Sequence, residues 1–360
     1  MEKVINLASD NTAGVAPKII SSLIKAANVS TMPYGEDPYT KKLQLVANEI
    51  FEREVLIYPV ATGSAANALA LATVSPPYGQ VFCHAQSHIE EDECAAPEFY
   101  IGGGKLTLLD GENGKFSATN LRDRLENHSP APSVHRAKPA VVSITQATEL
   151  GTIYTADEIL EISEVCRSNN LPLHMDGARL ANAIVATGAK IADCTWRVGV
   201  DILSLGATKN GVFAAEAVVF FDASKAADFE FRRKRGGHLF SKLRFLSSQL
   251  VPYLEKNYWI DLAENSNRRA CELAQGLGKI KSVTLLAEVQ TNMIFLQMPA
   301  KLNDVLKKKN CLFYSWGEKD GMIFARFVTS FNTTKGEVAR VLSIIQSAEP
   351  VTKSKKPIEQ

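Results

Sequence analysis

Two short apolar segments of the chain lead to charged side chains with complementary chemistry. The first segment, residues 173–176, ends in Asp176, and the second, residues 201–206, leads to Lys209. The residues between the two segments have a helical pattern. This length fits one β-α-β unit, in which two parallel strands present their carboxyl ends to one crevice. We therefore expect Asp176 and Lys209 to face the same ligand.

This pair of side chains suits pyridoxal 5′-phosphate. An amine forms a Schiff base with the cofactor's aldehyde, and a carboxylate keeps the pyridine nitrogen protonated so that the ring accepts electrons. Residues 61–67 follow another apolar strand and open a helix, where backbone N–H groups and the hydroxyls of Thr62 and Ser64 can bind a phosphate. Such a turn alone is weak evidence for a phosphate site. It becomes stronger evidence here because it precedes Asp176 and Lys209 in the chain. The sequence predicts this cofactor and no metal.

Seven short β-rich segments are expected to build the framework of this site. They are residues 55–60, 80–83, 105–109, 140–145, 171–175, 201–205 and 217–221. Their continuous apolarity indicates strands covered on both faces. Helical patterns separate several of them, and the pattern at residues 156–165 has Thr155 as a candidate cap. We predict an α/β fold with a three-layer large domain and a mostly parallel sheet of about seven strands.

The chain is expected to divide into an arm and two domains. Residues 1–50 contain two helical patterns and form the arm, and residues 51–250 form the large domain. Residues 251–350 form a small α+β domain with strands near 283–285, 293–296 and 323–328, followed by a polar tail at 351–360.

Composition points to an enzyme and excludes other classes. The 360 residues are 46% hydrophobic and carry a formal charge of +1, so nucleic-acid and membrane binding have little support. No segment has the apolar length of a membrane-spanning helix. The six cysteines contain no C-x-x-C pair, and the N-terminus lacks a signal-peptide core. We therefore expect a reduced, cytoplasmic setting.

Several motifs together resemble the low-specificity L-threonine aldolases, which are fold type I, aspartate aminotransferase-like enzymes. The motifs are Ala8-Ser9-Asp10-Asn11-Thr12, Tyr34-Gly35-Glu36-Asp37-Pro38, Thr62-Gly63-Ser64, His88 with Glu93, residues 173–179, Thr208-Lys209-Asn210-Gly211, and Ala325-Arg326-Phe327-Val328-Thr329 in the small domain. Around the lysine, many family members read Leu-Ser-Lys-Gly-Leu-Gly, whereas this chain has Gly206-Ala207-Thr208-Lys209-Asn210-Gly211. Residues 145–151 also lack the Glu-Asn-Thr-His of many relatives. These departures leave substrate and stereochemical preference open.

The resemblance implies roles for individual residues. Lys209 is the Schiff-base lysine, Asp176 pairs with the pyridine nitrogen, and Thr62, Gly63 and Ser64 bind the phosphate. Arg179 reaches the cofactor hydroxyl or the substrate carboxylate, and Ser9 and Arg326 complete a carboxylate clamp. By itself a lysine after a strand is usually a solvated surface charge, and Arg326 has an outward-facing surface arginine as its alternative.

Other implied roles concern the cofactor ring and a neighbouring subunit. His88 stacks over the ring and is placed to relay a proton. His135 aligns with a histidine that approaches the substrate hydroxyl from the neighbouring subunit in relatives, and Tyr34 lies in a motif contributed across a dimer interface. Arg232 is carried over as a phosphate contact, although the basic run 232–235 is more often a solvated helix face. The expected assembly is a homo-oligomer built on dimers whose subunits share their sites. A homotetramer of such dimers is favoured, and the choice between dimer and tetramer stays open.

The expected reaction is reversible retro-aldol cleavage of L-threonine, L-allo-threonine and related β-hydroxy-α-amino acids to glycine and an aldehyde. The nearest alternative is a β-eliminating or racemising enzyme on the same fold, because fold alone does not decide the reaction. A non-catalytic subunit that retains the fold is less favoured, since the lysine and the phosphate loop are intact.

Overall fold

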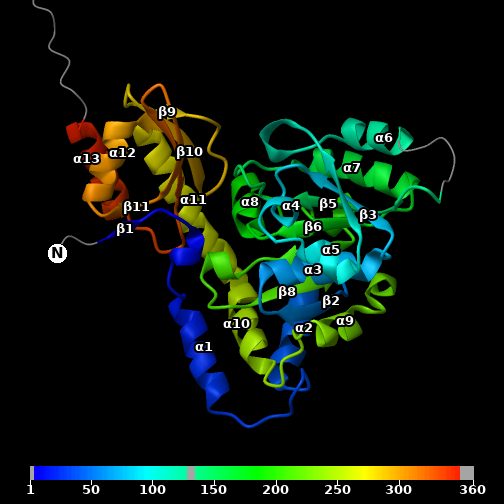
Figure 1. Ribbon diagram of the computed structural model, residues 1–360. Coiled ribbons are helices and arrows are strands. Elements are labelled where there is room, and N and C mark those ends of the chain that lie inside the picture. The colour runs from blue at the N-terminus through cyan, green and yellow to red at the C-terminus, as the bar shows by residue number, and fades with distance from the viewer. Residues whose placement is uncertain (1–3, 128–133, 349–360) are drawn as a thin grey trace, which may run out of the picture.

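The computed structural model describes residues 4–127 and 134–348, so the predicted polar tail lies outside the described residues. Figure 1 shows two lobes, with the large sheet in one and β9 to β13 in the other, and with α1 and α10 running below and between them. Within the described residues, no helix is long and apolar enough to cross a membrane.

The large lobe contains a seven-stranded sheet of order β2-β8-β7-β6-β5-β3-β4. Its strands are β2 (Leu56–Val60), β3 (Gly79–His84), β4 (Lys105–Leu109), β5 (Lys138–Thr145), β6 (Leu173–Gly177), β7 (Ile202–Leu205) and β8 (Glu216–Phe220). Each of the seven predicted segments forms one of them. The pairs from β7 through β6, β5 and β3 to β4 are parallel, and β8 is antiparallel to both of its neighbours. The predicted mostly parallel α/β sheet is confirmed.

Helices cover both faces of this sheet, as expected for strands without a polar side. The helices of the large lobe are α3 (Gly63–Val74), α4 (His88–Glu91), α5 (Ala96–Ile101), α6 (Ala118–Glu126), α7 (Ala156–Ser168), α8 (Leu180–Thr187) and α9 (Phe229–Arg235). Leu203 and Val219 pack into a core cluster with α7 and α8, whereas Ile202 and Val218 pack with α3. Successive residues of a strand thus enter opposite cores, which is the three-layer arrangement. Thr155 caps α7 in a reciprocal pair with Glu158, as predicted.

The N-terminal arm connects the two lobes. Strand β1 (Ile5–Asn6) pairs with β11 (Cys311–Leu312) of the small lobe, and the short helix η1 (Asp10–Thr12) follows. Helices α1 (Pro17–Ala27) and α2 (Pro38–Ile50) then pack against α10 (Arg244–Leu254). The arm therefore passes from the small lobe across to the base of the large one.

The small lobe contains an antiparallel sheet of order β12-β13-β10-β9. Its strands are β9 (Thr284–Leu285), β10 (Met293–Pro299), β12 (Tyr314–Lys319) and β13 (Met322–Val328), and its helices are α11 (Tyr258–Leu277), α12 (Ala300–Lys308) and α13 (Lys335–Ala348). The three strands predicted here correspond to β9, β10 and β13. The sequence did not predict β12, because it is mostly exposed and polar. Helix α10 spans the predicted boundary at residue 250, and the domain limits stay a prediction.

Candidate active site

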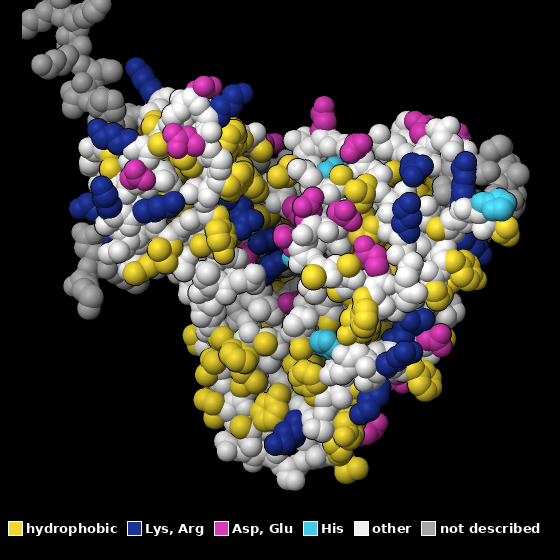
Figure 2. Space-filling model, viewed as in Figure 1, with side chains coloured by type: hydrophobic (Ala, Val, Ile, Leu, Met, Phe, Trp, Pro, Cys, Tyr) yellow, Lys and Arg dark blue, Asp and Glu magenta, His cyan; other side chains and the backbone are white. Residues whose placement is uncertain are grey.

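A cavity of about 380 Å³ opens at the carboxyl ends of the parallel strands. Seven of the predicted site residues line it together: Thr62, Gly63, Ser64, His88, Asp176, Arg179 and Lys209. Asn67, Glu93, Glu149 and Glu216 also line it. In the face shown in Figure 2, acidic and basic side chains gather where the two lobes meet. The structure thus brings the Asp and the Lys of the β-α-β unit to one crevice.

Asp176 is fixed at the end of β6 by hydrogen bonds to both of its carboxylate oxygens. Its Oδ1 accepts from the backbone N of Ala178 at 2.9 Å, and its Oδ2 accepts from Asn67 Nδ2 at 2.7 Å. The side chain is buried. Because both oxygens act as acceptors, the surroundings suit a carboxylate facing a protonated ring nitrogen.

Lys209 lies in the short helix η4 (Thr208–Asn210), directly after β7. Glu216 accepts hydrogen bonds from Ala207 N at 2.6 Å and Thr208 N at 3.3 Å, which fixes the turn before the lysine. At Gly206 a Cβ would meet the Ala178 backbone at 2.5 Å, so a larger residue would displace the turn. Burial and, next, the Arg179 charge lower the pKa of Lys209. A larger share of the amine is therefore neutral and nucleophilic.

The first turn of α3 offers an anion site. Thr62 is the N-cap, and its Oγ1 accepts from Ala65 N at 3.2 Å. The backbone N–H groups of Gly63 and Ser64 begin the helix, where no carbonyl of the helix can accept them. The space beside Gly63 is open, because a Cβ there would meet no atom within 4 Å. A phosphate can therefore approach the positive end of the helix closely.

His88 belongs to a chain of hydrogen bonds that reaches Asp176. Its Nδ1 lies 2.8 Å from Glu93 Oε1, and Asn67 Nδ2 donates to the same oxygen at 2.8 Å. Asn67 also bonds Asp176, so one amide connects the two ends of the chain. The Glu93 hydrogen bond raises the pKa of His88 against the opposing effect of burial. The ring is thus held in a fixed orientation at the cavity wall.

Arg179 forms a buried ion pair with Asp10 of the arm. Its Nε and Nη2 donate to the two carboxylate oxygens at 2.7 and 2.9 Å, and Asn292 Nδ2 adds a third contact to Asp10 at 3.0 Å. Burial alone would raise the pKa of Asp10, but the Arg179 guanidinium outweighs it and the pKa is lowered. The Nε and Nη2 edge of the guanidinium is therefore bound to Asp10.

Arg326 lies outside the residues that line the cavity. Its guanidinium sits over the ring of Tyr314, 5.4 Å from the centroid, and its Nε is buried without a hydrogen-bond partner among the described residues. Burial is the main cause that lowers the pKa of Arg326, and repulsion from the Arg179 charge is the second. The two guanidinium groups are therefore close enough to interact electrostatically. Its predicted contact with the substrate carboxylate stays a prediction.

Four further predicted residues are not brought to the cavity wall of this chain. Ser9 Oγ accepts from Asn11 N at 3.2 Å and caps η1. Tyr34 is about half exposed, and Lys234 Nζ lies over its ring, 4.6 Å from the centroid. His135 is exposed near the start of β5, the opposite end from the cavity. Arg232 lies in α9, and its Nε is buried without a partner among the described residues. The roles of all four stay predictions.

Several residues of the site had no predicted role, among them Asp10, Asn67, Glu93, Glu149 and Glu216. Asp10 and Asn67 stand inside motifs that were recognised for their neighbours. Glu216 is the only charged residue of the buried strand β8. A charged side chain in such a strand indicates that it has a polar partner in the interior. Burial raises the pKa of both Glu149 and Glu216 to about 7.

Comparisons with known proteins agree with this geometry. Residues 6–300 match the family model described as beta-eliminating lyase. The chain is 37% identical to a low specificity L-threonine aldolase of Pseudomonas aeruginosa over 95% of this chain and 98% of that protein. It is 24% identical to the Escherichia coli low specificity L-threonine aldolase over 94% of this chain and 97% of that protein.

Solved structures share the fold. A threonine aldolase of Leishmania major matches with a TM-score of 0.89 and 26% identity, over 95% of this chain and 99% of that one. A serine palmitoyltransferase of Sphingomonas wittichii matches with a TM-score of 0.70 and 15% identity, over 96% and 87%. At 15% identity this second likeness concerns the fold alone.

Proposed function

The chain belongs to the beta-eliminating lyase family and, within it, to the low-specificity L-threonine aldolases, and from this membership we propose that it cleaves L-threonine to glycine and acetaldehyde. The resemblance inferred from the sequence is thereby confirmed. The reaction breaks a carbon–carbon bond, which makes the enzyme an aldehyde-lyase. The observation that carries the proposal is the shared cavity of Lys209, Asp176 and the first turn of α3.

Pyridoxal 5′-phosphate is the cofactor, and the cavity fits it. The open first turn of α3 suits the phosphate, Asp176 suits the ring nitrogen, and Lys209 suits the aldehyde carbon. His88, fixed by Glu93 at the cavity wall, is proposed to stack against the cofactor ring. When bound, the protonated cofactor ring withdraws the electron pair that bond cleavage leaves on the substrate Cα.

The side chains of this chain orient the substrate. Lys209 would hold the cofactor, and its amine, when not bound to the cofactor, would carry a proton to or from the substrate Cα. Arg179 keeps its Nη1 edge for the substrate carboxylate, because Asp10 takes Nε and Nη2. Ser9 and Arg326 are proposed to complete this grip. With the carboxylate held in this way, the Cα–Cβ bond would be the one oriented for cleavage.

We extend the proposal to L-allo-threonine and related β-hydroxy-α-amino acids. Apart from Leu205, the apolar side chains of the cavity wall are alanines, among them Ala61, Ala147 and Ala214. Small side chains do not read the β-substituent strongly, since each extra methylene changes selectivity by only about 1–3 kcal/mol. Because each step is reversible, the same site adds glycine to aldehydes.

A homo-oligomer with shared sites is also proposed. Large apolar side chains are exposed around Tyr34, on the arm and on α9: Ile24, Met32, Leu45 and Phe231 are each more than half exposed. Figure 2 shows apolar side chains over the lower part of the molecule, where Figure 1 draws α1 and α10. Burial of such surfaces favours association. Monomers separated by dilution, checked by sedimentation, should be inactive if Tyr34 and His135 act across an interface.

A product assay tests the function. The purified enzyme with cofactor should release acetaldehyde and glycine from L-threonine and L-allo-threonine and leave both D-isomers intact. The release of 2-oxobutyrate and ammonia instead would support the β-eliminating alternative. A protein that binds the cofactor but converts none of the four isomers would contradict the proposed aldolase activity.

A further inference from the structure

A carboxyl group with no role in the site as described lies just beyond β5. Glu149 lines the same cavity as Lys209 and Asp176. Its Oε1 accepts a hydrogen bond from the backbone N of His88 at 2.7 Å. Its Oε2 is buried and has no hydrogen-bond partner in the described part of the chain. A buried carboxylate oxygen without a donor is costly, which favours a carboxyl group that carries a proton.

The surroundings of Glu149 bring the pKa of its carboxyl group close to neutral pH. The titratable and charged groups that face it are Cys83 of β3, His88 of α4, Asp176 and Arg179 at the end of β6, and Tyr154 of its own loop. Burial is the main cause that raises the pKa of Glu149 to about 7, and the Asp176 charge adds to it, while the His88 backbone N–H and the Thr145 hydroxyl act in the opposite direction. A group with this pKa exchanges protons readily at neutral pH.

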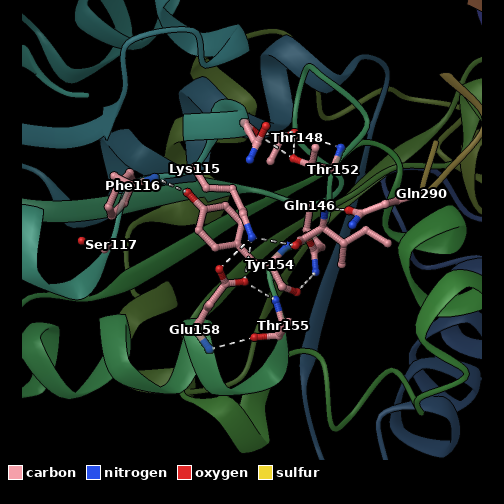
Figure 3. A network of polar contacts seen from close by, with 12 residues as sticks. Lys115, Phe116, Ser117, Gln146, Thr148, Thr152, Tyr154, Thr155, Glu158 and Gln290 are labelled. Atoms are coloured by element: carbon pink, nitrogen blue, oxygen red, sulfur yellow. Dashed lines mark hydrogen bonds and ion pairs between the residues drawn. The ribbon is translucent and has the colours of Figure 1, made fainter. Parts of the chain in front are cut away.

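The loop that carries Glu149 is fixed at both ends, as Figure 3 shows. Gln146 Nε2 donates to Tyr154 O at 2.8 Å, and Tyr154 N returns a bond to Gln146 Oε1 at 3.0 Å. The hydroxyls of Thr148 and Thr152 lie 2.6 Å apart, between these two anchors. Ile153 N also donates to Gln290 Oε1 at 2.8 Å. The loop therefore holds the carboxyl group in place before any ligand binds, which is what positioning for catalysis requires.

The other acidic groups of the cavity are already engaged. Both oxygens of Asp176 accept hydrogen bonds, and Glu216 accepts from two backbone N–H groups of the lysine turn. The Glu93 side chain is fully buried, and its Oε1 binds both Asn67 and His88, while its Oε2 has no partner among the described residues. His88 Nδ1 is in turn committed to Glu93. Glu149 differs from Glu93 because it is only partly buried and its Oε1 accepts from a backbone N–H instead of binding two side chains, so it combines a place on the cavity wall with an oxygen that a ligand can reach.

We propose that Glu149 is a further catalytic residue, which takes the proton of the substrate's β-hydroxyl during cleavage; this rests on the proposed aldolase function. The β O–H bond breaks and its proton passes to a Glu149 carboxylate oxygen. The O–H electron pair becomes the second bond of the aldehyde C=O, and the Cα–Cβ pair stays on Cα. Lys209 supplies the proton that Cα takes up, and Glu149 passes its own proton to water, from which Lys209 regains one.

The test separates the β-hydroxyl step from the rest of the site. Glycine has no β-hydroxyl, yet its Cα hydrogen exchanges with D₂O through Lys209 and the cofactor, which NMR follows. We expect Glu149→Gln holoenzyme to lose at least about 100-fold in threonine cleavage and to keep glycine exchange within a few-fold of wild type. The log kcat/KM of wild type should rise with pH through about 7, and this rise should vanish in Glu149→Gln. Glu161→Gln, an exposed glutamate of α7, is the control and should match wild type.

The possible outcomes distinguish a failure of the proposed role of Glu149 from a failure of the proposed aldolase function. Near-normal threonine cleavage by Glu149→Gln, or an equal loss of cleavage and exchange, would overturn the proposal. A wild-type enzyme that exchanges glycine but leaves threonine intact would instead overturn the aldolase function. If Glu149→Gln fails to bind the cofactor, Glu149→Asp carries the test, because it keeps the acid. Threonine cleavage by Glu149→Asp must then be slower than that of wild type, and its log kcat/KM must still rise with pH. A pH profile without this rise would refute the role of Glu149.

Discussion

Asp10 and Arg179 form a two-contact ion pair that brings the N-terminal arm to the end of β6. The side chain of Asp10 is 1% exposed and that of Arg179 is 12% exposed, so water screens the pair weakly. Asn292, which leads into β10 of the small lobe, donates to the same carboxylate. One acidic residue therefore joins the arm, the large lobe and the small lobe around the arginine proposed to bind the substrate.

Replacing Asp10 by Asn should affect substrate binding and stability more than cofactor binding. The variant leaves the Arg179 charge buried without its partner, and removing one member of a buried pair costs about 3–5 kcal/mol. The free guanidinium can also swing away from the cavity, so KM for threonine should rise at least about tenfold while kcat falls less. Steady-state cleavage, denaturant unfolding and the visible absorbance of the bound cofactor measure the three effects.

Glu52→Gln provides the control for this variant. Glu52 also contacts two cations, Lys190 and Arg197, but at the surface, where ion pairs contribute little. We expect its KM to match wild type and its stability to change less than that of Asp10→Asn. Equal KM values for Asp10→Asn and wild type would show that the ion pair does not position Arg179 for substrate.

Lys209→Ala should abolish the visible absorbance that the cofactor gains when it is bound to an enzyme amine. The turn around Lys209 is fixed by Glu216, Asn210 and Tyr253, and not by the lysine itself, so the variant should fold. Absorbance spectra with added cofactor and far-UV circular dichroism measure the two expectations. An unchanged spectrum would remove Lys209 from this role.

The sequence predicted the parts of the site that lie within one strand and its adjoining turn. Asp176 and Lys209 end continuous apolar segments, and the carboxyl ends of parallel strands meet at one edge, so their proximity follows from local pattern. The pairing of Asp10 with Arg179 does not, because it depends on the path of the arm between the lobes. The same holds for Asn67, whose contacts with Asp176 and Glu93 require the packing of α3 against the sheet. Strand β12 was missed for a simpler reason, since it has no apolar run.

Glu216→Gln should change how stability depends on pH. Burial raises the folded-state pKa of Glu216 to about 7, above the value of about 4.3 for an unfolded glutamate. The folded state therefore holds this proton more tightly, and the stability it contributes is lost as pH rises from about 4.3 through about 7. Gln keeps an acceptor oxygen for Ala207 N but does not titrate, so the variant should lose less stability between pH 5 and pH 8 than wild type. Denaturant unfolding of the holoenzyme at both pH values measures this, and equal losses would mean that Glu216 is ionised throughout.

Arg326→Ala tests why this site should break the Cα–Cβ bond. Arg179 offers the substrate carboxylate only one edge, so a second cation is needed to hold that group near the ring plane. Arg326 is the proposed second cation, because the charge of Arg179 reaches it and its buried Nε has no partner within the described residues.

We expect Arg326→Ala to weaken amino-acid binding and to lower threonine cleavage by roughly two powers of ten, since a charge-assisted contact that sets geometry is lost. Side transamination, seen as a slow loss of the cofactor's bound absorbance, should become detectable once Cα can rotate. Steady-state cleavage of L-threonine and L-allo-threonine, together with cofactor spectra, measures both effects. Arg268→Ala, an exposed arginine on α11, should behave like wild type. Normal turnover of Arg326→Ala with both substrates would mean that the arginine serves the packing of β13 against Tyr314 and not the substrate.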